Sequence, residues 1–159
     1  MPKIFEPDEY VKSVFEIDFE KLYENGFRGL MFDIDNTLVP QDEDATEPVK
    51  ALFEKLSALG FRTVILSNNS EERVSRFAKD IPVLYLSRAR KPLKRGYNRA
   101  LALLKMEREQ AAFIGDRVMT DIFGAKRVGI YCILVEYIRK NGEKPNLLRK
   151  IENRLYKRP

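Results

Sequence analysis

Three apolar runs of this 159-residue chain are each followed by small polar or acidic side chains. These side chains are Asp33 and Asp35 after residues 29–32, Ser67 and Asn68 after residues 61–66, and Asp116 and Asp121 after residues 111–114. In an open parallel sheet, ligands bind outside the carboxyl ends of the strands. If the three runs are strands of one sheet, we expect these side chains to meet at one edge and form a binding or catalytic site.

The four aspartates predict a site for a divalent cation. Asp33 and Asp35 are two residues apart, which in an extended chain places both side chains on the same side. Two close carboxylates repel each other and raise a pKa unless a cation joins them. With Asp116 and Asp121, the local formal charge at pH 7 is about −4. Oxygen ligands in a chain without histidine favour a hard cation, Mg²⁺ ahead of Ca²⁺ or Zn²⁺.

Donors for a phosphate group lie close to these carboxylates in the predicted order of elements. Mg²⁺ that is held by a few carboxylates usually also binds a substrate phosphate. Ser67 can donate from its hydroxyl and its backbone N–H. Asn68 opens a turn at residues 68–70 that leads into a predicted helix N-terminus, and such an N-terminus favours anions.

A lysine completes the set of candidate residues. Lys91 follows the apolar run at 83–86 and precedes Pro92, which suits the start of a helix. Lys94 is its rival, three residues later. The chain thus offers a carboxylate nucleophile, a second carboxylate as acid or base, a cation site, a hydroxyl and an ammonium group.

Each of these residues also has a simpler structural interpretation when it is taken alone. Asp33 and Asp35 could be a turn pair, and Ser67 could cap a helix. Asp121 could be a first-turn acid that the helix dipole favours. Because all these residues follow strands at the same predicted edge of the sheet, we favour a catalytic or binding site over these structural interpretations. Thr37 is interpreted as a capping or turn residue and stays outside the set.

The motifs resemble those of the haloacid dehalogenase (HAD) superfamily. Asp33-Ile34-Asp35-Asn36-Thr37-Leu38-Val39 resembles its first motif. Ser67 resembles its second motif, Lys91 its third, and residues 115–121 its fourth. All four occur in order over residues 28–135.

The resemblance implies a phosphatase with Mg²⁺ as its cofactor. Asp33 would attack phosphorus and form an aspartyl-phosphate, while Asp35 would protonate the leaving group and then activate water. Ser67 and Lys91 would hold the phosphoryl oxygens. The metal ligands would be Asp33, the backbone carbonyl of Asp35, Asp116 and, in support, Asp121. An acid at position 35 is the pattern of the superfamily's phosphatases and not of its dehalogenases.

More narrowly, the chain resembles the YqeG-type subgroup of HAD subfamily IIIA. The resemblance rests on the DIDNTLV motif, the lead-in at residues 23–30 and the short length of the chain. That subgroup is similar to the mitochondrial phosphatidylglycerophosphate phosphatases, which implies dephosphorylation of phosphatidylglycerophosphate to phosphatidylglycerol. Two alternatives stay open: a phosphatase of small phosphomonoesters or nucleic-acid phosphate ends, and a non-catalytic binding or regulatory protein on the same fold.

An alternation of strands and helices must position the candidate residues. Strands are predicted at 29–32, 61–66, 83–86, 111–114 and 129–135, and helices at 47–59, from Ser70 onward, at 93–106 and at 120–127. Near-continuous apolar strands indicate burial on both faces, so we predict an α/β fold with a doubly wound, Rossmann-like, parallel five-stranded sheet. Apolar residues between Val11 and Tyr23 predict an amphipathic segment that packs on the domain, and residues 145–156 have helical spacing.

The chain length fits a single domain over residues 1–159, with its core at about 28–135. The gap from Asp35 to Ser67 has room for one loop and one helix, and the gap from Ser67 to Lys91 for one helix and one strand. Neither leaves room for an inserted cap domain. An open site suits a large or surface-bound substrate, or closure by a partner subunit.

The positive charge of the chain is concentrated near its C-terminal end. Residues 137–159 contain eight Lys or Arg residues and two acids, a formal charge of +6, whereas the whole chain carries +5. The segment is predicted to be a solvated, docked helix or to contact anionic lipid, where each surface cation adds ~1 kcal/mol. Nucleic acid is a weaker alternative, because the segment has few aromatic side chains for base stacking.

Composition excludes several other classes of function. Without histidine there is no Ser-His-Asp or Cys-His arrangement, and with one cysteine there is no internal disulfide. Cys132 lies in an apolar run and is interpreted as a buried small hydrophobe. No run approaches the ~18 apolar residues of a membrane span, and the N-terminus carries acids and prolines rather than a signal sequence. We therefore expect a cytoplasmic protein, with peripheral contact to the inner membrane face.

Overall fold

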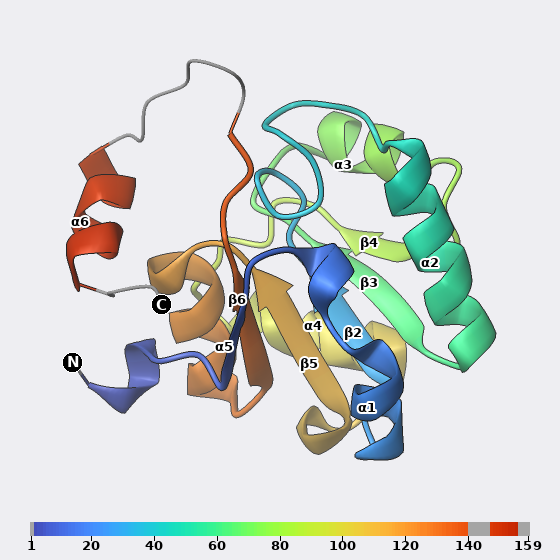
Figure 1. Cartoon of the computed structure of the whole chain (residues 1–159), viewed down its shortest axis with the longest axis horizontal. Helices are drawn as coiled ribbons and strands as arrows, with labels where there is room; N and C mark the ends of the chain where they lie inside the picture. The colour runs from blue at the N-terminus through green and yellow to red at the C-terminus, as the bar shows by residue number, and fades with distance from the viewer. Residues whose placement is uncertain (1, 140–146, 156–159) are drawn as a thin grey trace.

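The fold is a three-layer α/β/α sandwich around one parallel sheet (Figure 1). The structure is a computed structural model that describes residues 2–139 and 147–155. Six strands pair side by side in the order β1-β6-β5-β2-β3-β4, and every pairing is parallel. The strands are β1 (Glu9–Val11), β2 (Gly29–Phe32), β3 (Arg62–Leu66), β4 (Leu84–Leu86), β5 (Ala111–Gly115) and β6 (Tyr131–Val135). The predicted doubly wound α/β fold is confirmed.

Helices cover both faces of the sheet. They are α1 (Phe19–Glu24), α2 (Glu47–Leu59), α3 (Glu71–Ala78), α4 (Lys94–Leu104) and α5 (Phe123–Val128), and a further helix, α6 (Leu147–Leu155), follows near the C-terminus. Side chains from α1, α2 and α3 join Leu30 and Phe32 in one apolar core, while side chains from α4 and α5 join Met31 in the other. Alternate residues of β2 thus point into opposite cores, as the pleat of a strand requires.

The boundaries of α2 show how local sequence sets an element. The side chain of Thr46 accepts a hydrogen bond from the backbone N–H of Val49 at 3.3 Å, which satisfies one free donor of the first turn. Val49, Phe53 and Leu56 are fully buried at helical spacing, and they pack this face on the sheet. Gly60 ends the helix at φ 105°, a left-handed conformation that glycine adopts without steric cost.

The structure corrects three details of the sequence prediction. The sheet has six strands and not five, because Glu9–Val11 adds to the outer edge of β6 as β1. The predicted helix at 120–127 consists of a turn of π-helix at Val118–Ile122 followed by α5. Phe15 is 49% exposed, so it does not pack on the domain as its neighbours Val14 and Ile17 do.

The order of connections brings the predicted site to the centre of the sheet. The chain runs from β2 outward through β3 to β4, then returns to the other side of β2 to form β5 and β6. Between β2 and β5 the connections leave in opposite directions, which is where ligands bind in doubly wound folds. Residues 36–66 and 68–90, all described, contain only the expected loops, helices and strands, so no cap domain is inserted there.

The predicted burial of the cysteine is confirmed. Cys132 is fully buried in β6. Among the described helices, none combines the length and the apolar character that crossing a membrane requires.

Candidate active site

Three carboxylates converge where β2 and β5 end. Asp33 follows β2, Asp116 follows β5, and Asp121 lies in the π-helical turn after it. One oxygen from each can be chosen so that all three lie within 4.8 Å of one another. This all-oxygen set fits a hard divalent cation such as Mg²⁺. Asp33, Asp116 and Asp121 are thus brought together as predicted, while the carboxylate of Asp35 lies outside this cluster.

The three carboxylates of the cluster differ in their access to solvent. The side chains of Asp116 and Asp121 are 0% and 1% exposed, whereas that of Asp33 is 13% exposed. The Oδ2 atom of Asp121 accepts hydrogen bonds from the backbone N–H groups of Asp116 and Arg117, both at 3.2 Å. Asp121 is therefore fixed inside the protein, and Asp33 is the carboxylate that a substrate can reach.

Lys91 is the cation at the centre of the cluster. Its Nζ donates to Asp33 Oδ1 at 3.0 Å and to Asp121 Oδ1 at 2.8 Å. Its side chain is 3% exposed, while Lys94 is exposed in the first turn of α4. The geometry favours Lys91 over its rival Lys94. Pro92 lies in the turn before α4 and not at the start of the helix.

Burial dominates the electrostatics of these groups. It raises the pKa of Asp33 well above its usual value, with Lys91 opposing the rise and Asp121 and Asp116 adding to it. Burial also raises the pKa of Asp116, against the effect of Arg149. For Lys91, burial acts to lower the pKa, but Asp121 and Asp33 raise it above its usual value. The cluster is short of positive charge, which is the condition for binding a cation.

The carboxylate of Asp35 points into a separate set of donors. Its Oδ1 accepts from Arg73 Nη2 at 3.0 Å and from the backbone N–H of Asp42 at 2.8 Å. Its Oδ2 accepts from Asn69 Nδ2 at 3.2 Å. This placement leaves the backbone carbonyl as the group of Asp35 that is predicted to bind metal, and that role stays a prediction.

The side chains of Ser67 and Asn68 form hydrogen bonds with the backbone of neighbouring loop residues. Ser67 is 2% exposed, and its Oγ accepts from the backbone N–H of Asn69 at 3.1 Å. The side chain of Asn68 pairs with the backbone of Lys91, accepting from its N–H at 2.6 Å and donating to its carbonyl at 3.1 Å. The amide of Asn68 is thus engaged in positioning Lys91. Phosphate contact by Ser67 or Asn68 stays a prediction.

Two residues that contact Asp116 were not among the predicted set. The hydroxyl of Thr37, which is 1% exposed, donates to Asp116 Oδ1 at 2.9 Å. Arg149, from α6, pairs with the other oxygen of Asp116 and donates from Nη1 to its backbone carbonyl at 3.1 Å. The motif position of Thr37 was a signal for it. Arg149 lies in a helix that is rich in cations, so nothing in the sequence distinguished it.

The C-terminal helix therefore docks on the fourth motif. Glu152, two per cent exposed, accepts from the backbone N–H of Met119 at 3.1 Å. The guanidinium of Arg149 also lies 4.2 Å from the centre of the Tyr137 ring, a favourable cation–π distance. These contacts bring part of the basic segment to the active site. Residues 140–146 and 156–159 of that segment lie outside the described residues.

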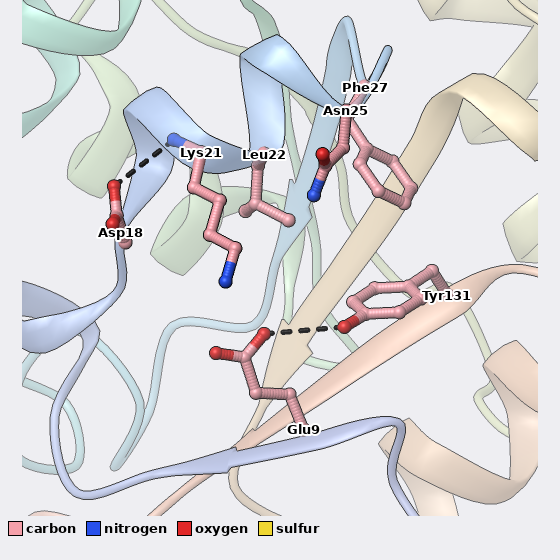
Figure 2. A pocket seen from close by; sticks show the side chains of 7 residues that line it. All are labelled: Glu9, Asp18, Lys21, Leu22, Asn25, Phe27 and Tyr131. Atoms are coloured by element: carbon pink, nitrogen blue, oxygen red, sulfur yellow. Dashed lines mark hydrogen bonds between the residues drawn. The ribbon is translucent and has the colours of Figure 1, made fainter.

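A separate pocket lies at the amino ends of β1 and β6, whereas the carboxylate cluster lies at the carboxyl ends of β2 and β5 (Figure 2). It has a volume of about 330 Å³ and lies among α1, the first residue of β1 and the first residue of β6. In it, the hydroxyl of Tyr131 donates to Glu9 at 3.3 Å. None of the predicted site residues lines this pocket, so it is not the candidate active site.

Comparison with known proteins finds similar hydrolases and phosphatases. The haloacid dehalogenase-like hydrolase family matches residues 41–129. The probable phosphatase YqeG of Bacillus subtilis is 39% identical over 136 residues, which are 85% of this chain and 79% of that protein. Phosphatidylglycerophosphate phosphatase 1 of Chlamydomonas reinhardtii, a chloroplast protein, is 31% identical over 155 residues, which are 90% of this chain. The match spans only 55% of the length of that algal protein.

Solved structures share the fold. An uncharacterized protein of Listeria monocytogenes superposes with a TM-score of 0.60 at 21% identity, over 76% of this chain and 86% of the other. This likeness supports the architecture of the sheet. Together with the sequence matches, it leads to one assignment: the chain belongs to the haloacid dehalogenase-like hydrolase family, and within it is similar to phosphatases.

Proposed function

We propose that this protein is a Mg²⁺-dependent phosphomonoester hydrolase that acts through an aspartyl-phosphate on Asp33. The observation that carries the proposal is the arrangement of Asp33, Lys91, Asp116 and Asp121. Among the three clustered carboxylates, Asp33 has the most access to solvent, and it also pairs with the buried ammonium group of Lys91. That is the arrangement that a nucleophile facing an anionic substrate requires.

The chain's own residues account for the proton and bond changes. An oxygen of Asp33 forms a bond to phosphorus while the bond from phosphorus to the leaving oxygen breaks, and Asp35 gives that oxygen its proton. Water then attacks the phosphorus, Asp35 takes up a proton from it, and the bond to Asp33 breaks to release phosphate. Lys91 and Ser67 bind the phosphoryl oxygens through both steps.

Asp33, Asp116 and Asp121 would hold Mg²⁺ together with the backbone carbonyl of Asp35. When bound, the cation neutralises charge on the transferring phosphoryl group. Thr37 orients Asp116 through the hydrogen bond to its Oδ1 atom.

For the substrate we propose a phosphorylated lipid headgroup, with phosphatidylglycerophosphate first. Support comes from the name of the algal relative and from the exposed side of α6. Leu147 and Ile151 on that helix are 74% and 45% exposed, and Lys150 and Arg154 are exposed beside them. Apolar and cationic side chains on one short helix suit the surface of an anionic membrane, which would place the enzyme at the inner membrane face.

The test is Mg²⁺-dependent phosphate release from four substrates, with D33N as the control. The substrates are phosphatidylglycerophosphate in mixed micelles, p-nitrophenyl phosphate, phosphoglycolate and a 3′-phosphorylated oligonucleotide. Activity on the lipid that D33N abolishes would support the whole proposal. Activity on another member alone would keep the mechanism and discard the lipid. No release from any of them, with Mg²⁺ bound, would favour a binding or regulatory role.

Vesicle flotation tests the membrane contact separately. The L147S/I151S variant should float less with anionic vesicles than the wild type does, and both residues are exposed enough to be replaced without disturbing a core. Equal flotation with neutral and anionic vesicles would argue against a charge-driven contact.

A further inference from the structure

Arg73 lies in an unfavourable position unless Asp35 requires it. It is the third residue of α3, in the first turn after the N-cap Ser70, where the helix dipole disfavours a cation. The residue is only 4% exposed, so its charge is removed from water. Its Nη2 donates to Asp35 Oδ1 at 3.0 Å, while its Nε and Nη1 atoms are buried without a hydrogen-bond partner. Asp35 is thus the carboxylate that compensates this buried charge.

Arg76 on the same helix shows the contrast. It lies one turn further on, pairs with Asp44 at 2.9 Å, and both side chains are about half exposed or more, at 49% and 74%. Such a pair contributes little to stability or geometry, since water can replace it. The pair of Arg73 with Asp35 has exposed fractions of 5% and 18%, and its geometry is correspondingly restricted.

Asn69 holds the second oxygen of the same carboxylate. Its Nδ2 donates to Asp35 Oδ2 at 3.2 Å, and its Oδ1 accepts from the backbone N–H of Ser70 at 2.8 Å. Its own backbone N–H donates to Ser67 Oγ at 3.1 Å. Asn69 therefore connects the predicted phosphate-binding hydroxyl to the predicted acid and base, and its side chain is fixed at both ends.

We propose that Arg73 is a positioning residue for the reaction, and that with Asn69 it sets the direction in which Asp35 delivers its proton to the leaving oxygen. The inference rests on the proposed function. Donors on both oxygens, from Arg73, Asn69 and the backbone N–H of Asp42, leave this carboxyl group little freedom to rotate, and proton transfer requires a donor within hydrogen-bond reach of its acceptor. Arg73 acts through Asp35 and does not itself contact the phosphoryl group.

The test compares two leaving groups of nearly the same shape. Phenol has a pKa of about 10, like tyrosine, so phenolate needs a proton as it departs, whereas p-nitrophenol is much more acidic and its anion needs one far less. We expect R73Q to lower kcat/KM for phenyl phosphate about tenfold or more, and to change it much less for p-nitrophenyl phosphate. R73K should recover part of the loss, because it restores the charge without the planar fork. R76Q is the matched control. The contact of Arg76 with the Asp42 carbonyl is long, at 3.4 Å, and exposed to water, so R76Q should leave the ratio of the two values unchanged.

Asn69→Ala is the second variant, in case R73Q does not fold. Like R73Q, it should lower kcat/KM for phenyl phosphate more than kcat/KM for p-nitrophenyl phosphate. In the D35N background, R73Q should add little further loss for phenyl phosphate, because the group it positions is already gone. Melting temperatures of all variants separate folding from chemistry.

Two results would overturn the inference. Equal losses for both substrates in R73Q and N69A would mean that these residues only support the fold. A gain for phenyl phosphate would mean that Arg73 restrains Asp35 instead of positioning it. If the wild type hydrolyses neither aryl phosphate nor any of the other proposed substrates with Mg²⁺, the proposed function fails first, and this inference fails with it.

Discussion

Replacing Lys91 by methionine would test how the buried charges of the active site are balanced. Lys91 pairs with Asp33 at 3.0 Å and with Asp121 at 2.8 Å, and the side chains of Lys91 and Asp121 are 3% and 1% exposed. Methionine keeps an unbranched apolar stem of similar length, so the change removes the charge with little change in packing. Two carboxylates would then lie in the interior without their shared partner.

The size of the effect follows from this burial. Removing one partner of a buried ion pair costs about 3–5 kcal/mol of unfolding free energy, because the remaining charge stays uncompensated. In a chain of this length, each kcal/mol lowers the melting temperature by about 2–4 °C, so K91M should melt roughly 6–20 °C below the wild type. Mg²⁺ should raise the melting temperature of K91M more than that of the wild type, because the cation replaces the lost positive charge.

Thermal unfolding of the metal-free protein, with and without added Mg²⁺, measures both effects. K94M is the matched control, since Lys94 is exposed three residues away and its loss should change stability by no more than about 0.5 kcal/mol. If K91M melts with K94M, the ion pairs carry no net stability and the reasoning is wrong. If Mg²⁺ stabilises K91M and the wild type equally, the cation does not bind at this cluster.

Three further predictions concern other parts of the molecule. R149Q should bind Mg²⁺ about tenfold more tightly or better, because Asp116 would lose its competing cation. A hydrogen bond to a charged group is worth about 1.5–3 kcal/mol, which sets this magnitude. Calorimetric titration measures the affinity, and an unchanged affinity would contradict the prediction. Burial raises the pKa of Cys132 to about 12, so thiolate at pH 8 should be about one part in ten thousand, and the thiol should react with a disulfide reagent only on unfolding. The stability that this group contributes is present below pH 9 and is lost as the pH rises toward 12. In G115A, the new methyl carbon would lie 2.6 Å from Asp121 Cγ, so this carboxylate must move. We expect the free energy of unfolding in denaturant to fall by about 1–3 kcal/mol and Mg²⁺ to bind more weakly. A fully stable variant with normal metal affinity would refute the expected clash.

The convergence of the carboxylates could be predicted because it depends on strand ends. Asp33 and Asp116 each follow a buried apolar run directly, and the rule that parallel strands end at one edge brings them together. Lys91 could be selected over Lys94 only by its place in a motif. Arg73 and Arg149 were missed, because each reaches the site through a pairing 38 or 33 residues distant in sequence, and helical periodicity does not specify such partners.

The central strands of the sheet could be predicted because they are fully buried, and the edge strand β1 could not because it is not. Strands β2 and β5 are buried along their whole length, so their sequences read as continuous apolar runs. Strand β1 has three residues, all partly buried, and neither periodicity nor turn residues mark it. It exists because β6 offers it an edge, which is a property of the tertiary structure.

The docking of α6 on Asp116 makes two distant events thermodynamically reciprocal. If Mg²⁺ and Arg149 compete for the same carboxylate, then metal binding loosens the C-terminal helix by the same free energy by which release of the helix tightens metal binding. A surface that binds α6 only when Arg149 has left Asp116 would then raise the affinity of the carboxylate cluster for a cation. The occupancy of the metal site and the location of the protein would then depend on the same equilibrium, the docking and release of α6.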